Sequence, residues 1–288
     1  MSTEIKDSFP STPRVMADGS AGSGHANFGR LLAAEWTKLR TVRSTFWSFA
    51  VLIVVTVGLT ALFMAITAAT WNNTANRNGN ARTDLLADPA RTILTSGLGF
   101  GQLAICVLGV MVATNEYSTG MVRSTLLASP HRLRTLAAKA ITFAVPVFIL
   151  GEIIGFACFA IGTAILKSHV TVSLSGPHVL RSVIGVGLYL GMLGLFSLAI
   201  GQIIRHTAGA ITATIAMVIV IDPLAGLLPD SWGAHVAGYL PNNAGVLLMD
   251  PTPTGSNVLS AWEGYAVFGI WVAVLFAIAS WMLVARDA

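Results

Sequence analysis

The chain has 288 residues, of which 54% are hydrophobic and only 10% are charged, and its formal net charge is +4. Soluble domains carry about 25% charged residues, so this composition excludes an ordinary water-soluble fold. No hydrophilic segment is long enough to bury a core of its own. The basic residues cluster beside apolar stretches, where anionic lipid explains them better than nucleic acid, so we expect no nucleic-acid binding.

The N-terminal segment, residues 1–27, is rich in Ser, Gly, Ala and Asp. It contains no apolar run of the kind that a signal peptide needs. Such a composition cannot bury enough apolar surface to fold. We therefore expect a disordered cytoplasmic tail over 1–27 and one membrane domain over 28–288.

The segment before the first apolar stretch has the spacing of an amphipathic helix, with apolar residues at helical intervals and basic residues on the flank. Such a helix would lie in the membrane interface, with its tryptophan at the depth of the lipid headgroups. A basic flank that only sets topology is the alternative. The residues expected to mark the interfacial helix are Trp36, Lys38, Arg40 and Arg43.

Six apolar stretches follow, and each is long enough to cross a bilayer. A helix rises 1.5 Å per residue, so about 20 residues span roughly 30 Å of hydrocarbon. The sequence therefore predicts an all-α polytopic membrane protein with six transmembrane helices. The stretches cover residues 46–70, 93–114, 140–166, 183–204, 208–228 and 265–284.

The distribution of Lys and Arg predicts the orientation, because cytoplasmic loops retain these residues. If both termini are inside, 12 of the 17 basic residues lie on the inner side and 5 on the outer side. The outer segment 229–261 contains no Lys or Arg. We expect a multi-pass protein of the plasma membrane with both termini in the cytoplasm.

The second inner loop, residues 115–139, is too long and too patterned for a minimal turn. Gly and Pro bracket a short helical segment in it, and such a helix suits docking in a groove on a soluble partner. A basic linker that only enforces topology is the alternative. The docking residues expected here are Glu116, Tyr117, Gly120, Arg123, Leu126, Leu127, Pro130 and Arg132.

With these residues the chain resembles the membrane subunits of ABC transporters of the ABC-2 type, particularly actinobacterial permeases. The resemblance covers residues 28–286. It rests on EWTKLRTVRSTFW before the first stretch, on E-Y-x-x-G followed by S-P-x-R-x-R-x-x-x-A-K, and on six stretches with a long outer segment before the last. Relatives often carry Gly-Thr where this chain has Gly120-Met121.

The resemblance implies an interfacial connecting helix before the first span and a coupling helix in the second inner loop that contacts an ABC ATPase subunit. It also implies a second permease copy, in a homodimer or heterodimer, and a re-entrant helical hairpin before the last span. The outer segment 229–261 fits two short apolar helices broken around Pro241-Asn242-Asn243. An ordinary packed loop is the alternative.

The chain has no convincing nucleotide site of its own. A glycine-rich run at 19–24 is followed by His25 and Ala26, where a P-loop has Lys and Ser or Thr. We expect no directly bound cofactor, with ATP and Mg²⁺ held by the partner ATPase. The six histidines form no ligand pair at helical spacing, so no metal site is expected.

Two acidic residues, Glu152 and Asp222, interrupt apolar stretches. A carboxylate in hydrocarbon costs several kcal/mol unless it is paired, hydrated or protonated. Both are therefore candidates for a transport path. Pro146 and Pro223 lie nearby, so a structural role at a helix kink stays open.

Glycines spaced four residues apart occur in three of the stretches, and small residues at this spacing let transmembrane helices approach closely. Contact with a second copy of the chain through one of these pairs stays open. The pairs are Gly97 with Gly101, Gly151 with Gly155, and Gly187 with Gly191.

These features favour the transmembrane subunit of an ATP-driven exporter whose substrate the sequence does not identify. A non-transporting sensor or scaffold subunit that docks a soluble partner through residues 116–139 is the alternative. A membrane-embedded enzyme ranks third, because Glu152 and Asp222 lack a paired nucleophile, base or metal.

Overall fold

The computed structural model describes residues 28–41, 43–71, 79–121, 132–225, 227–251 and 259–285, and every regular element in these ranges is helical. Five helices are long and apolar enough to cross a membrane. The prediction of an all-α, membrane-embedded protein is confirmed at this level. The five are α2 (Arg43–Ala69), α4 (Pro89–Ser118), α6 (Arg132–Leu166), α7 (Val179–Ile204) and α12 (Ala261–Ala285).

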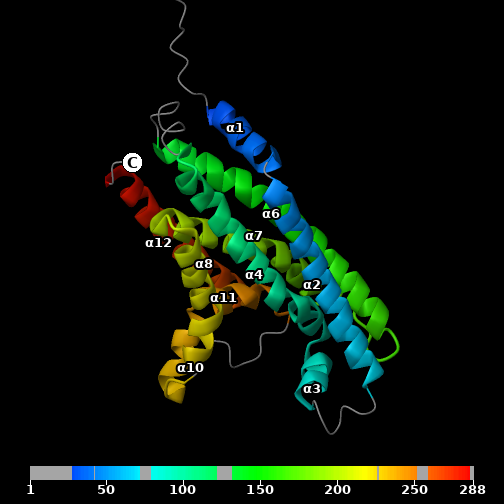
Figure 1. The fold of residues 1–288 in the computed structure, drawn as a ribbon. Coiled ribbons are helices and arrows are strands. Elements are labelled where there is room, and N and C mark those ends of the chain that lie inside the picture. Colours follow the sequence, from blue (N-terminus) through cyan, green and yellow to red (C-terminus); the bar gives the residue numbers. More distant parts are fainter. Residues whose placement is uncertain are drawn as a thin grey trace, which may run out of the picture.

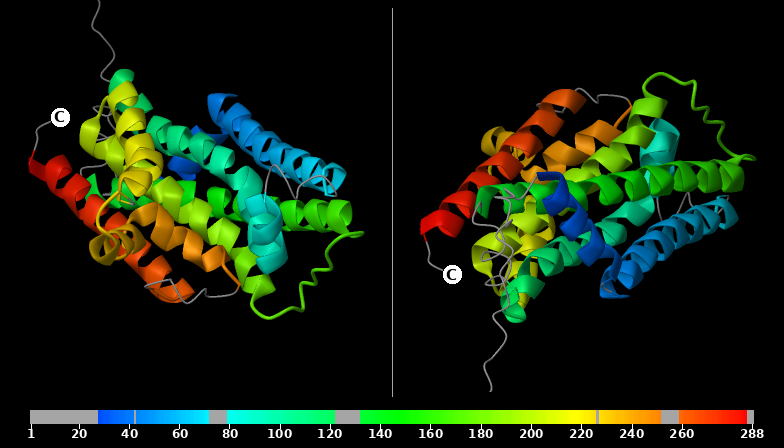
Figure 2. Two further views of the ribbon diagram at one scale, coloured as in Figure 1. Left: turned by 90° about the horizontal axis from the view of Figure 1, so that it is seen from below. Right: turned by 90° about the horizontal axis from the view of Figure 1, so that it is seen from above.

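Two short helices lie at the two ends of the bundle. Helix α1 (Phe28–Thr41) lies at one end, beside the start of α6 (Figure 1). The last turns of α12 lie at the same end, which we call the α1 end. Helix α3 (Gly79–Ala87) lies at the opposite end. Figure 2 shows α1 and α2 meeting in a V, so α1 is not a continuation of the first long helix.

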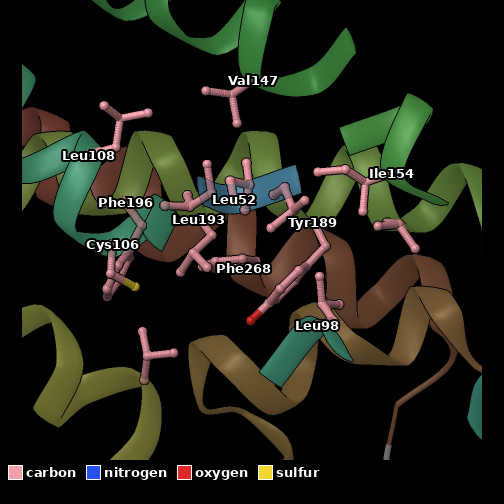
Figure 3. Close-up of a cluster of buried hydrophobic side chains, with 14 of the residues drawn as sticks. Leu52, Leu98, Cys106, Leu108, Val147, Ile154, Tyr189, Leu193, Phe196 and Phe268 are labelled. Atoms are coloured by element: carbon pink, nitrogen blue, oxygen red, sulfur yellow. The ribbon is translucent and has the colours of Figure 1, made fainter. Parts of the chain in front are cut away.

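Helix α7 forms the centre of the bundle. In its most apolar window 78% of the residues are buried, against 22% for α2 and 17% for α12, so α7 faces protein while α2 and α12 form the periphery. Its side chains Tyr189 and Phe196 pack around Phe268 of α12 (Figure 3). A helix that is apolar on all sides is expected at such a buried position.

Most of the paired glycines predicted to form close helix contacts do so within this chain. A Cβ added at Gly151 would lie 2.7 Å from the Cα of Gly187, and one at Gly155 would lie 2.7 Å from the carbonyl oxygen of Val183. Glycine is therefore needed where α6 crosses α7. Gly97 and Gly101 of α4 likewise face threonines of α2.

The predicted fifth span is not one continuous α-helix. It consists of α8 (Thr207–Ile215), the π-helical turn η1 (Ala216–Val220) and α9 (Ile221–Ala225). Pro223 has no backbone N–H to donate, and a missing donor favours a local departure from α-helical pairing. The apolar helix at Thr207–Val220 is shorter than the five long helices, so a sixth crossing is not established by helix length.

In its described part, the segment 229–261 contains two short α-helices before α12, as the sequence predicts. They are α10 (Asp230–Gly238) and α11 (Pro241–Val246), and α11 runs into a 3-10 turn, η2 (Leu247–Met249). The break falls before Pro241, which begins α11. A Cβ added at Gly245 of α11 would lie 2.7 Å from the Phe268 ring, so this helix packs directly on the core.

Candidate functional site

At the α1 end, four charged side chains from three helices form a linked chain, which we call the ionic chain. The Lys38 Nζ atom of α1 lies 2.6 Å from Glu35 Oε1 and 3.0 Å from Glu116 Oε1 of α4. The other carboxylate oxygen of Glu116 forms an ion pair with Lys139 of α6. The ionic chain therefore joins α1 to both α4 and α6.

The local sequence explains how α1 presents two charges to the bundle. Glu35 and Lys38 are three residues apart, so they lie on one face of the helix. That face packs against α6. Trp36 and Arg40 point away and are exposed. The apolar spacing of the segment predicts Lys38 on the polar flank, but the structure turns it inward.

Two charged residues of the ionic chain are almost fully buried, so the stability of the protein depends on their pairing. Only 6% of Glu35 and 3% of Lys139 is exposed. A buried charge is tolerated when it is paired, and removing one partner leaves the other uncompensated, at a typical cost of about 3–5 kcal/mol. Moving one of these helices away from the others would therefore break an ion pair and leave a buried charge without its partner.

Lys38 stays protonated at neutral pH in this setting. Burial lowers the pKa of its ammonium group, but the hydrogen bond to Glu35 and the negative charges of Glu116 and Glu35 outweigh that effect. The net result is a pKa raised above the usual value of a lysine. Lys38 therefore acts as a fixed positive charge between two carboxylates.

A cavity of about 410 Å³ lies beside the ionic chain. Its walls come from α1, α2, α4 and α6, and they combine the charged residues with hydroxyl and apolar side chains. Thr45 and Ser48 line it from α2, while Leu108 and Val112 line it from α4. Leu39 of α1 also lines this cavity and packs on the hydrophobic core, so α1 contacts the bundle through both polar and apolar side chains.

Two further docking candidates, Tyr117 and Gly120, lie at the end of α4. The Tyr117 hydroxyl donates a hydrogen bond of 2.7 Å to Gln202 Oε1 of α7, and the Arg205 guanidinium stands 5.1 Å from the centre of the tyrosine ring. Gly120 has a φ of +72°, which lies in the left-handed region that glycine favours. It follows the C-cap residue Thr119 and so ends the helix.

Arg132, the last docking candidate, contacts the C-terminal turn of α12. Its Nη1 atom donates a hydrogen bond of 2.8 Å to the Leu283 carbonyl, and Arg205 Nη2 donates one of 3.3 Å to the Met282 carbonyl. The last carbonyls of a helix lack partners within the helix and carry partial negative charge. Two cations therefore fasten α12 to the α1 end.

The structure brings together Lys38 and Glu116 of the predicted sites, and places Tyr117, Gly120 and Arg132 at the same end. Sequence reasoning did not select Glu35, Lys139 or Gln202 as site residues. The three-residue spacing of Glu35 and Lys38 was the available signal. Arg123, Leu126, Leu127 and Pro130 lie outside the described residues, and only the helical backbone is described for Arg43 and Asp222.

Glu152 lies on α6 against the backbone of α7, where a Cβ at Gly187 would collide with its carboxyl group. Its Oε1 atom is buried and has no hydrogen-bond partner among the described residues. Glu152 does not line the cavity beside the ionic chain. It therefore belongs to the packing of α6 on α7 and not to the ionic chain.

No protein-family model matches this chain, and no curated protein matches it significantly. The fold and the ionic chain define the protein as a polytopic helical membrane protein whose N-terminal helix is ion-paired to the bundle.

Proposed function

We propose that this chain is the permease subunit of an ATP-driven exporter of the ABC-2 type. It works with separate ABC ATPase subunits and a second permease copy, and ATP and Mg²⁺ bind to the ATPase. The observation that supports the proposal best is the ionic chain, because Glu116 and Lys139 lie near the two ends of the segment 115–139 that the sequence predicts to dock a partner.

The ionic chain suits the transmission of a movement from that loop. Glu116 lies near the end of α4, Lys139 lies near the start of α6, and Lys38 of α1 bonds to the same carboxylate. A push on the loop by a closing ATPase pair would therefore act on α4, α6 and α1 at once. Because ion pairs join these helices, we expect them to move as rigid bodies. Rigid-body movement is one way in which proteins switch between states.

The membrane arrangement in this proposal has six crossings, with α8, η1 and α9 forming the fifth. Helices α10 and α11 form a re-entrant hairpin on the outer side. Both termini and the loop between α4 and α6 face the cytoplasm, and the membrane is the plasma membrane. The bias of basic residues supports this orientation.

The test first searches the genes beside the one for this chain for an ABC ATPase, and then co-purifies that ATPase with the full chain and reconstitutes the complex in lipid nanodiscs. We expect Lys38→Met to lower ATP hydrolysis by the complex about tenfold or more, because it leaves the buried Glu35 carboxylate without its cation and removes one of the two lysines that pair with Glu116. The matched control is Arg40→Met, which removes an exposed cation two residues along the same helix. It should leave hydrolysis unchanged.

Two outcomes would count against the proposal. If no ATPase assembles with the chain, the sensor or scaffold alternative takes its place. If Lys38→Met and Arg40→Met complexes hydrolyse ATP equally well, the ionic chain does not couple the two subunits.

A further inference from the structure

A second cavity, of about 440 Å³, lies between α4, η1, α9 and α11. Pockets for small molecules occupy about 300–1,000 Å³, so this one is large enough for a ligand. Its polar lining consists of three carboxamide side chains, and its apolar lining comes from the π-helical turn and the proline after it. The lining residues are Gly99, Gln102, Val218, Ile219, Pro223, Asn242 and Asn243.

Two of the three carboxamides, those of Gln102 and Asn242, bond to a buried tyrosine. Tyr189 Oη lies 2.6 Å from Gln102 Oε1 and 2.6 Å from Asn242 Oδ1. A hydroxyl carries one proton, so it donates to one amide and accepts from the other, whose amide group is then turned to offer its nitrogen. Figure 3 shows Tyr189 among apolar side chains, which fix the ring.

The Gln102 side chain retains hydrogen-bonding capacity after this contact. Within the described part of the chain, the bond with Tyr189 is the only one that this side chain makes. An amide group can make up to four hydrogen bonds, two as donor and two as acceptor. Gln102 can therefore serve a ligand as both donor and acceptor.

This cavity differs from two others in the charge of the side chains that line it. Glu35, Lys38, Glu116 and Lys139 line the cavity beside α1, and a cavity of about 470 Å³ beside α3 is lined by Asp84, Asp88, Arg91 and Asp250. Among the described side chains that line the cavity between α4, η1, α9 and α11, which we call the amide cavity, none is ionisable. Within a membrane, a charged group of a ligand would find no counter-ion among the described lining residues. A neutral group that forms hydrogen bonds needs no counter-ion.

The π-helical turn adds a second feature typical of binding sites. Val218 and Ile219 of η1 line the same cavity as the amides. π-helical turns inside α-helices are rare and occur frequently at functional sites. A lining that combines apolar and amide side chains is complementary to an amphiphile.

We infer that the amide cavity binds an uncharged amphiphile whose head carries hydroxyl or amide groups, such as a neutral glycolipid or a glycoside-like molecule. If the proposed export function holds, this ligand is the class of molecule that the protein moves. The binding itself requires no ATPase, so it can be tested on the permease alone.

Gly99 allows the cavity to be filled without disturbing the fold. A Cβ added at Gly99 meets no atom within 4 Å, and the residue is exposed on the cavity wall. Gly58 of α2 provides a matched control, because a Cβ there also meets nothing within 4 Å and the residue is likewise exposed. Gly99→Phe should block the cavity, whereas Gly58→Phe should not.

The experiment measures thermal stabilisation of the full chain in nanodiscs by octyl glucoside below its micelle concentration. Octyl sulfate and octyl trimethylammonium serve as charged probes of equal chain length. We expect the glucoside to stabilise the wild type and Gly58→Phe at the same concentration. Gln102→Leu should need about tenfold more, the loss expected for one or two hydrogen bonds, and Gly99→Phe, which blocks the cavity, should need at least tenfold more.

A second arm replaces octyl glucoside with a monoglucosyl diacylglycerol in the nanodisc. Stabilisation by this lipid alone assigns the cavity to a membrane lipid, whereas stabilisation by octyl glucoside assigns it to a diffusible amphiphile. Equal responses of Gly99→Phe and Gly58→Phe, or stronger stabilisation by a charged probe, would overturn the inference. Either result would leave the ATPase test of the export proposal unaffected.

Discussion

At the scale of single residues, the polar groups of this protein differ in whether they have partners. Glu116 accepts from two lysines, so its charge is compensated although the site is largely buried. Glu152 has a buried oxygen without a partner among the described residues. The ion pairs of Glu116 stabilise the contacts between helices, whereas the unpartnered oxygen of Glu152 destabilises the contact between α6 and α7.

The difference leads to a prediction for Glu152. Glu152→Gln should assemble and export normally, because no cation and no described cavity depends on the charge. Glu152→Leu should raise the melting temperature, since it removes an unpartnered polar atom from the α6–α7 contact. Detergent melting and export assays on both variants provide the measurement. If a stable Glu152→Gln protein did not export, the Glu152 carboxylate would be assigned to the transport path.

Gly120 gives a second prediction at this scale. Its backbone is left-handed, and a Cβ there meets nothing within 4 Å, so any cost of substitution is conformational. Gly120→Ala should destabilise the protein by about 1–2 kcal/mol. Gly120→Asn should cost less, because asparagine tolerates this region better. Equal unfolding midpoints for the two variants in a denaturant titration would contradict this account.

At the scale of helices, α6 and α7 approach each other through glycines, and the closeness varies along the contact. At Gly155 a Cβ would press on the backbone of α7, with 2.7 Å to the Val183 oxygen. At Gly191 a Cβ would lie 3.6 Å from the nearest atom, Phe148 Cβ, which is ordinary van der Waals contact. The same pair of helices thus contains a tight and a tolerant position.

We therefore predict that Gly155→Ala destabilises the protein by about 1–3 kcal/mol, since overpacking forces the helices apart. Gly191→Ala, the matched control in the same interface, should change stability by less than about 0.5 kcal/mol. Thermal unfolding of both variants in the same detergent gives the comparison. A tolerated Gly155→Ala would mean that α6 and α7 are not in rigid contact.

At the scale of the whole molecule, α1 and the last turns of α12 lie at the same end of the bundle (Figure 1). Arg132 and Arg205 bind the last carbonyls of α12 there. The orientation proposed above puts this end in the cytoplasm, where basic residues are retained.

Cysteine labelling in intact cells tests that orientation. Gly24→Cys and Ser124→Cys should be shielded from an impermeant thiol reagent, while Asn78→Cys and Asn257→Cys should react. The native cysteines, Cys106 and Cys158, are buried and should contribute little background. The opposite labelling pattern would invert the topology and remove the loop after α4 from reach of a cytoplasmic ATPase.

The sequence by itself determined that the protein is helical and membrane-embedded, and where its five long helices lie. These properties follow from local hydropathy, because a bilayer leaves a long apolar segment little alternative to a helix. The glycine pairs also marked close helix contacts, except at Gly191, where the contact is an ordinary one. The interruption of the fifth apolar stretch by a π-helical turn was not predicted, since only Pro223 signalled it.

The tertiary structure alone decided which polar groups meet. Lys38 and Glu116 are 78 positions apart, and Tyr189 is 87 positions from Gln102 and 53 from Asn242. Periodicity gives the face of a helix on which a residue lies but not the neighbour that this face will contact. The ionic chain and the amide cavity depend on how α1, α4, α6, α7 and α11 pack against one another. Packing is set by the fit of many side chains at once, so no single segment encodes it.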